Sequence, residues 1–252
     1  MIEKVKTGID GLDKALLGGI PKGNLVLVAG GAGTGKSSLC MQYLVNGAKT
    51  GEKGLYVSTE QNRDELVKQA KEFGWPIEEL ERKGLLQISY LDLPKQDNFF
   101  GWVKRTTSIF QPKRIVIDSL TALADTMMVH EMKTKGSFTL VQVIEDVFPT
   151  TLTEKLITKN LLYSLITDLK SFGATALLTT ELPEQSEYLS ADGMSEFITD
   201  GVIKLEYLGV GASVFRTLRI RKMRYTDHEK GSLSYEMTSN KGIEVKKQEF
   251  GL

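Results

Sequence analysis

The sequence contains a single cysteine among its 252 residues, so no disulfide can form within the chain. It has only six prolines, and its 32 basic and 32 acidic side chains leave no net charge. This balance excludes a globally basic nucleic-acid-binding protein, although it permits a local basic patch. No apolar run is long enough to span a bilayer, and residues 1–6 lack the apolar core of a signal peptide. We therefore expect a cytoplasmic protein with no membrane partner.

The length of the chain favours one globular domain, and its apolar and charged fractions of 41% and 25% are typical of folded proteins. A chain of this size buries enough apolar surface to fold without cross-links. Cys40 lies in a run with apolar residues at helical spacing. We expect it to be a small core residue, because free cysteines are usually buried.

Residues 30–37 read Gly-Gly-Ala-Gly-Thr-Gly-Lys-Ser, which fits the pattern G-x-x-x-x-G-K-[ST] of phosphate-binding loops. An apolar, β-prone run precedes this segment, and apolar residues at helical spacing follow it, as a strand–loop–helix unit requires. Glycines let backbone N–H groups approach a phosphate, while Lys36 can reach the β- and γ-phosphates and Ser37 can hold Mg²⁺. We therefore predict that the following residues bind a nucleotide: Gly30, Gly31, Ala32, Gly33, Thr34, Gly35, Lys36, Ser37 and Ser38.

Two carboxylates could complete a site for nucleotide hydrolysis, because each follows an apolar strand. Asp118 is placed to hold Mg²⁺ together with Ser37, and the alternative is a strand-end residue that caps the next turn. Glu60 could orient and polarise the attacking water, and the alternative is a solvated charge. Position alone does not decide between these roles for Glu60.

Thr180 and Glu181 end another apolar run, and from there they could sense the γ-phosphate. The segment after this run is acidic and has no Lys or Arg between its carboxylates, which are Glu181, Glu184, Glu187, Asp192 and Glu196. A nucleic-acid phosphate would be repelled by this segment.

Strand patterns alternate with helical patterns up to about residue 200, which predicts βαβ units and a parallel sheet. The strands expected there cover residues 24–29, 55–59, 85–91, 114–118 and 175–180. From residue 202 onward short turns separate the apolar runs, so antiparallel strands are expected over 202–207, 216–224 and 231–237.

Further helices are expected between the strands. Asn62 is placed to cap a helix that ends before Gly74, and Pro76 suits the first position of a short helix. The least regular region, about 124–160, is predicted to be a helical insertion. Within it, residues 138–148 have helical spacing, and Thr151 could cap the next helix.

The most basic stretch covers residues 216–224, and His228 follows closely. It could be a solvated strand face, or a set of cations directed at the phosphates of a nucleotide or of nucleic acid. Aromatic residues do not alternate with these cations, so base stacking is not indicated.

The order of these motifs resembles that of the KaiC/RadA branch of RecA-fold ATPases, and the resemblance covers nearly all of the chain. The matching segments are 7–13 and 18–23 before the loop, then 73–75, 117–119, 179–181, 196–200 and 222–228. The resemblance implies an α/β fold with a RecA-like P-loop NTPase core. It implies a mostly parallel central sheet flanked by helices, a C-terminal antiparallel strand extension, and a single ATPase domain over 1–252.

The resemblance also implies a shared active site. ATP with Mg²⁺ would bind between protomers of a homo-oligomeric ring or short filament. Glu60 matches the family's water-activating glutamate. Lys222, Arg224 and His228 would approach the ATP of a neighbouring subunit, where the cations stabilise transition-state charge.

The chain departs from the family pattern at several positions. Gln61 stands where KaiC proteins have a second glutamate, and Tyr225 and Asp227 replace a Gly and a hydroxyl residue of the K-L-R-G-T-S-H motif. The F-x-x-A polymerisation motif of RadA recombinases is absent from the sequence. Single-domain members of this type are regarded as RadA paralogues in archaea.

Three functions remain open at this stage. The first is an ATPase that binds single-stranded DNA or a recombinase and modulates recombination or repair. The second is a KaiC-like signalling protein or autokinase that acts on protein partners. The third is a nucleotide-binding scaffold with negligible turnover, which Gln61 makes conceivable.

Overall fold

The computed structural model describes residues 2–93, 99–123, 150–183, 186–210 and 213–246, which form two sheets and the helices around them. The strands are β1 (Lys4–Val5), β2 (Ile20–Pro21), β3 (Leu25–Gly30), β4 (Gly54–Ser58), β5 (Leu86–Tyr90), β6 (Arg114–Asp118), β7 (Thr175–Glu181), β8 (Gly201–Val210), β9 (Ser213–Met223), β10 (Ser232–Thr238) and β11 (Gly242–Lys246). The helices are α1 (Leu12–Ala15), α2 (Lys36–Lys49), α3 (Arg63–Glu72), α4 (Ile77–Arg82), α5 (Phe99–Phe110), α8 (Thr150–Ser171) and α9 (Ser195–Ile198).

The larger sheet has nine strands in the order β11-β10-β9-β8-β3-β7-β6-β4-β5. Pairing is parallel from β8 through β5 and antiparallel from β8 outward to β11. The α/β fold, the mostly parallel sheet and the antiparallel C-terminal extension are therefore confirmed. The sequence did not predict β11 or the small antiparallel pair of β1 and β2.

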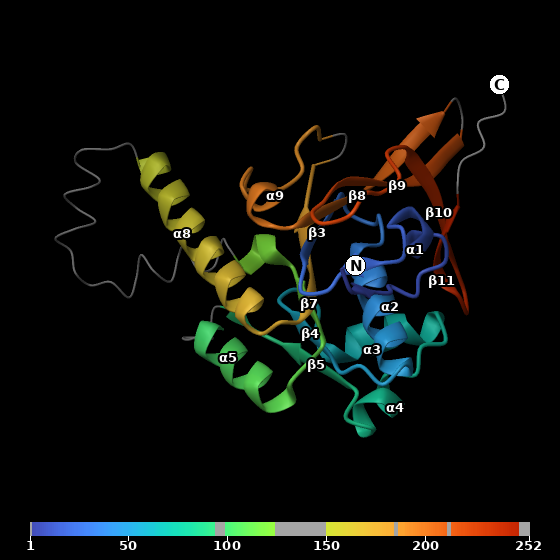
Figure 1. Ribbon diagram of the computed structural model, residues 1–252, viewed down its shortest axis with the longest axis horizontal. Coiled ribbons are helices and arrows are strands. Elements are labelled where there is room, and N and C mark those ends of the chain that lie inside the picture. The colour runs from blue at the N-terminus through green and yellow to red at the C-terminus, as the bar shows by residue number, and fades with distance from the viewer. Residues whose placement is uncertain (1, 94–98, 124–149, 184–185, 211–212, 247–252) are drawn as a thin grey trace.

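Helices cover both faces of the parallel strands: α2, α3 and α4 lie on one side and α5 and α8 on the other (Figure 1). Side chains alternate between these two cores along each strand, as the two-residue period of a β-strand requires. The core on the α2 side contains Val26, Val28, Tyr56, Val116 and Leu177. The core on the α8 side contains Leu25, Leu27, Leu55, Ile117 and Leu178.

Parallel pairing brings the carboxyl ends of four strands to one edge of the sheet. Gly30 is opposite Glu181, and Ser58 is opposite Asp118, so β3, β7, β4 and β6 end together. The polar residues that follow these strands are therefore gathered at one edge, where ligands bind in open α/β sheets.

The buried guanidinium of Arg114 on β6 holds helix α2, which follows the phosphate loop, against the sheet. The side chain of Arg114 is 4% exposed, and it pairs with Glu52 at 2.5 Å while its guanidinium also donates to the Tyr43 carbonyl at 2.8 Å. A methyl group at Gly47 would lie 2.2 Å from Arg114 Nε, so only glycine lets α2 approach β6 this closely. Truncating one partner of such a buried pair is destabilising, because the other charge is left unpaired.

The expected helix starts are met with small shifts. Asn62 caps α3 as predicted, and Glu65 completes a reciprocal capping box. Pro76 is the cap of α4 rather than its first residue, and Thr151 lies inside α8 rather than before it.

Residues 124–149, with the predicted helix over 138–148, lie outside the described residues. The C-terminal part of α8 packs into the core through Leu162, Leu165, Ile166 and Leu169. No helix among the described residues is both long and apolar enough to cross a membrane.

Candidate active site

The phosphate loop joins the end of β3 to the start of α2. Gly35 caps the helix in the left-handed conformation, with φ of 93°, which glycine adopts without strain. A Cβ at Gly30 would lie 2.5 Å from the Leu205 carbonyl oxygen of β8, so the loop leaves the sheet where only glycine fits. The positive end of the α2 dipole therefore faces the concave side of the loop.

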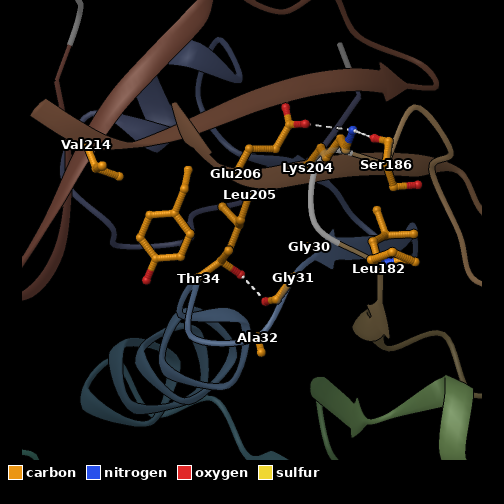
Figure 2. A pocket seen from close by; sticks show the side chains of 12 residues that line it. Gly30, Gly31, Ala32, Thr34, Leu182, Ser186, Lys204, Leu205, Glu206 and Val214 are labelled. Carbon is orange, nitrogen blue, oxygen red and sulfur yellow. Dashed lines mark hydrogen bonds and ion pairs between the residues drawn. The ribbon is translucent and has the colours of Figure 1, made fainter. Parts of the chain in front are cut away.

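Two side chains of the loop hold the carbonyl of Gly31. Thr34 Oγ1 donates to it at 2.8 Å, a contact drawn in Figure 2, and Lys36 Nζ donates to it at 3.0 Å. Lys36 is buried, and its ammonium also lies 3.5 Å from a carboxylate oxygen of Glu181. The geometry thus places a cation and an acidic side chain at the predicted phosphate position.

Asp118 is buried at the end of β6, and both of its carboxylate oxygens accept hydrogen bonds. Tyr56 donates its phenolic proton to Oδ2, and Thr179 donates its hydroxyl proton to Oδ1. All three residues lie on the α2 face of the sheet, since Tyr56, Val116 and Leu177 all belong to that core. The carboxylate is therefore fixed beneath the helix that carries Ser37.

The Tyr56 phenol connects the two predicted metal ligands. Burial and the Asp118 carboxylate raise the pKa of Tyr56 well above its usual value, against a smaller lowering by a hydrogen bond with Ser37. Tyr56 therefore stays protonated and donates to Asp118 in the physiological range. Each carboxylate oxygen of Asp118 keeps a free lone pair after these bonds, which leaves it able to accept from a metal-bound water.

Glu60 follows β4 at the same edge of the sheet, and its side chain is exposed. Ser119 donates its hydroxyl proton to Glu60 Oε1, and the Ser119 amide donates to Thr59 Oγ1 at 2.9 Å. The residue after Asp118 thus orients Glu60, while the rest of the carboxylate faces solvent. A base that activates water requires this combination of fixed orientation and access.

Thr180 and Thr179 point to opposite faces of the sheet. The Thr180 hydroxyl lies 3.1 Å from that of Thr121 and accepts from the Ala191 amide at 3.2 Å. It is therefore placed on the α8 side, away from Asp118. Glu181, the next residue, is half exposed and pairs with Lys36.

Lys222 and Arg224 lie near the amino-terminal ends of the parallel strands, whereas the phosphate loop lies at their carboxyl ends. Arg224 pairs with Asp200 at 3.2 Å, and the amide of Asp200 donates to the carbonyl of Leu25, the first residue of β3. Lys222 Nζ donates to the backbone carbonyls of Glu196, Phe197 and Thr199. Burial, followed by the charge of Arg224, lowers the pKa of Lys222.

The remaining predicted nucleotide ligands also lie away from the concave side of the loop. Ser38 is buried and accepts from Gln69 of α3 at 3.5 Å. His228 Nδ1 lies 2.9 Å from the Glu229 carbonyl, and the Glu229 amide donates to Ala15 of α1. Within one subunit, the loop, Glu60 and Asp118 are brought together, and Lys222, Arg224 and His228 are not.

A family model described as "ATPase: KaiC" matches residues 5–250, which is nearly the whole chain. The chain belongs to the KaiC ATPase family. The sheet order and the match to a KaiC-like structure agree with the RecA-like fold of this ATPase family.

Two kinds of protein are similar to the chain in sequence. The chain is 30% identical to a UPF0273 protein of Thermotoga maritima over all of its length and 99% of that protein. It is also 30% identical to the circadian clock protein KaiC3 of Synechocystis, but it covers only 46% of that protein. Among solved structures, a KaiC-like protein from the archaeon Pyrococcus horikoshii matches with a TM-score of 0.78 and 32% identity, covering 97% of this chain and 99% of that one.

Several residues that contact the predicted site residues were not predicted from the sequence. The two-residue period of β7 shows that Thr179 and Thr180 face opposite ways, so one of them had to face Asp118. Tyr56 carries a polar hydroxyl between the apolar Leu55 and Val57 of a buried strand, which is a detectable signal. Tyr207 and Tyr235, which donate to the loop from β8 and β10, gave no signal because their positions depend on strand register.

The buried thiol of Cys40 predicts a loss of stability at alkaline pH. Burial, with the Asp118 carboxylate second, raises the pKa of Cys40 well above its ordinary value of 9.0. The unfolded chain releases this proton above that pH while the folded chain keeps it, so the stabilisation is complete below it and is lost as pH rises. The loss should be about 1.4 kcal/mol per pH unit. Denaturant titrations above pH 9 measure how the free energy of unfolding changes with pH. This free energy should fall less steeply with pH in Cys40→Ala than in wild type. Equal slopes in the two proteins would mean that the thiol ionises in the folded state.

Proposed function

We propose that the protein is a Mg²⁺-dependent ATP hydrolase whose active site is completed by a second copy of the chain. One observation carries this proposal: the phosphate loop, Glu60 and Asp118 converge at one edge of the sheet, while the cations of the 222–228 segment lie at the other. Membership of an ATPase family and the loop geometry support nucleotide binding.

The loop residues would bind the triphosphate. Backbone N–H groups of the loop donate to the phosphate oxygens, and the Lys36 ammonium neutralises the β- and γ-phosphates once it exchanges Glu181 for them. Glu60 would take a proton from the attacking water as its oxygen bonds to the γ-phosphorus. The bond from that phosphorus to the bridging oxygen breaks, so the products are ADP and inorganic phosphate.

The donor set fits Mg²⁺. Ser37 offers a hydroxyl at the start of α2, and Asp118 offers a fixed carboxylate, which are the hard oxygen ligands that this ion prefers. Mg²⁺ bound there would neutralise charge that develops on the phosphate oxygens.

The two groups of residues are too far apart to act within one subunit. Arg224 is level with Leu25 at the start of β3, and the loop leaves from Gly30 at its end. At a rise of about 3.3 Å per residue, this separation along the strand is about 16 Å. The Lys222 and Arg224 side chains, moreover, are directed toward α9. If they serve catalysis, they must do so on the nucleotide of a neighbouring copy, in a ring or short filament.

Three substitutions separate binding from turnover. Lys36→Ala should abolish ATP binding, and Glu60→Ala should keep binding but lower kcat by about 10²-fold or more. Arg224→Ala should likewise spare most of the binding and lower kcat by about 10³-fold, the usual contribution of a cation supplied in trans. Phosphate release and equilibrium binding of a fluorescent ATP analogue measure the two effects.

The control for these variants is Lys49→Ala, which removes an exposed cation at the far end of α2. A wild-type rate no higher than that of Glu60→Ala would support a scaffold without turnover. An Arg224→Ala rate equal to that of wild type would contradict the shared site. Since Arg224 also pairs with Asp200, the melting temperature of each variant is measured as well.

A second candidate function is the binding of single-stranded DNA. The observation that favours it is that the side chains of Arg219 and Arg221 on β9 are exposed. Phosphate contacts by these side chains should make binding weaken with salt, with a log–log slope that falls by about 0.7 for each contact removed. Arg219→Ala with Arg221→Ala should therefore reduce both affinity and slope in a fluorescence anisotropy titration, and Lys49→Ala should not. Absent or salt-insensitive binding would leave protein partners as the better explanation.

A further inference from the structure

Three side chains form a row across the antiparallel extension beside the phosphate loop. Tyr207 of β8 is directly opposite Arg216 of β9. Ser234 of β10 pairs with Thr217 of β9, and one step further along the antiparallel register Tyr235 lies next to Arg216. Residues of the same alternation, Leu205, Leu218 and Leu233, belong to the α2 core, so the row faces the loop and its helix.

Both tyrosines donate to carbonyl oxygens of the loop. Tyr207 Oη donates to the Gly33 carbonyl at 2.7 Å, and Tyr235 Oη donates to the carbonyl of Thr34. The Arg216 guanidinium lies 5.4 Å from the centre of the Tyr207 ring, which keeps that ring in place. Burial raises the pKa of Tyr235 beyond the physiological range, so its hydroxyl remains a donor.

These two bonds fix the direction of the N–H groups that follow them. Within one trans peptide unit the C=O and the N–H point in opposite directions, because the unit is planar. The Gly33 carbonyl is held toward Tyr207, so the N–H of Thr34 in the same peptide unit points away from the tyrosines. The Thr34 carbonyl is held toward Tyr235, so the N–H of Gly35 also points away from them. Amides turned in this way face the concave side of the loop.

We propose that Tyr207 and Tyr235 are positioning residues that keep the phosphate loop in its anion-binding conformation. This inference rests on the proposed function, because it assigns the loop to phosphate binding. Gly33 and Gly35 flank the two peptide units, and glycine lets a peptide rotate with little steric cost. A carbonyl that rotated inward would present a negative dipole to the phosphate, so the loop needs donors that oppose this rotation.

Packing alone does not support the loop on this side. A pocket of about 280 Å³ borders it, lined in part by Gly30, Gly31, Ala32 and Thr34, with Tyr207 in its wall. Across the pocket from the loop, Lys204 bridges Glu206 and the Ser186 carbonyl, as Figure 2 shows. Because atoms that border open space lose packing contacts, the Tyr207 hydrogen bond supplies the restraint there, while Tyr235 holds the next carbonyl from within the core.

The test is the affinity for phosphate-bearing ligands in hydroxyl-deletion variants. Tyr207→Phe and Tyr235→Phe keep the rings and remove only the donors. We expect each to weaken binding of ADP and of inorganic pyrophosphate by about threefold to tenfold, the usual net effect of one hydrogen bond. Tyr163→Phe on the exposed side of α8 is the matched control and should bind as wild type does. Calorimetric titration well below the melting temperature measures these affinities.

The results separate positioning from a merely structural role. If the melting temperature falls but both affinities equal those of wild type, the tyrosines only stabilise the fold and the proposal is wrong. If Lys36→Ala loses binding while both tyrosine variants bind normally, the proposal fails and the phosphate-binding function stands. If wild type binds neither ADP nor pyrophosphate, the proposed function itself fails.

Discussion

Parallel pairing around β3 is the constraint on which the rest of the site depends. It requires β3, β4, β6 and β7 to end at the same edge, so the phosphate loop, Glu60 and Asp118 meet without any one segment having to fold back. The same parallel pairing places the start of β8 level with the start of β3, together with Asp200 and the cations that bind it. One topology thus places the phosphate loop and these cations at opposite ends of the strands, separated by the length of a strand.

The antiparallel extension connects the phosphate loop to the region of these cations. β9 carries Arg216 beside the loop at one end and Lys222 at the other, and β8 and β10 bring Tyr207 and Tyr235 to the loop carbonyls. Two further hydrogen bonds connect β11 to α2, the helix after the phosphate loop. Gln42 of α2 accepts from the Ile243 amide at 2.7 Å and donates to the Ile243 carbonyl at 3.1 Å. The hydrogen-bonded strands of the extension therefore link the cations at one end of β9 to the phosphate loop at the other.

Most of the fold was predictable because it follows from local pattern. The alternation of apolar strands with helices predicted the parallel sheet, and the capping residue Asn62 predicted the start of α3. Asp118, Glu60 and the loop were predicted as site residues because each lies at or just after the end of an apolar strand. The short β11 was missed, since five residues between turns carry little periodic signal.

The parts that sequence could not supply depend on register between distant segments. Thr179 rather than Thr180 contacts Asp118, a choice that the face of β7 determines. Tyr207 and Tyr235 lie far from the loop along the chain, and only the antiparallel pairing of β8, β9 and β10 brings them to it. The separation of Arg224 from the loop likewise emerged only once β8 was placed beside β3.

The most direct test of the shared site mixes two inactive variants. Lys36→Ala retains the cations and Arg224→Ala retains the loop, so co-expressed subunits of the two kinds create some interfaces in which both halves are wild type. In a random one-to-one assembly about one quarter of the interfaces are of this kind, so the ATPase rate should recover to about a quarter of wild type. A co-expressed mixture whose rate equals the mean of the two separate variants would contradict a site built from two subunits.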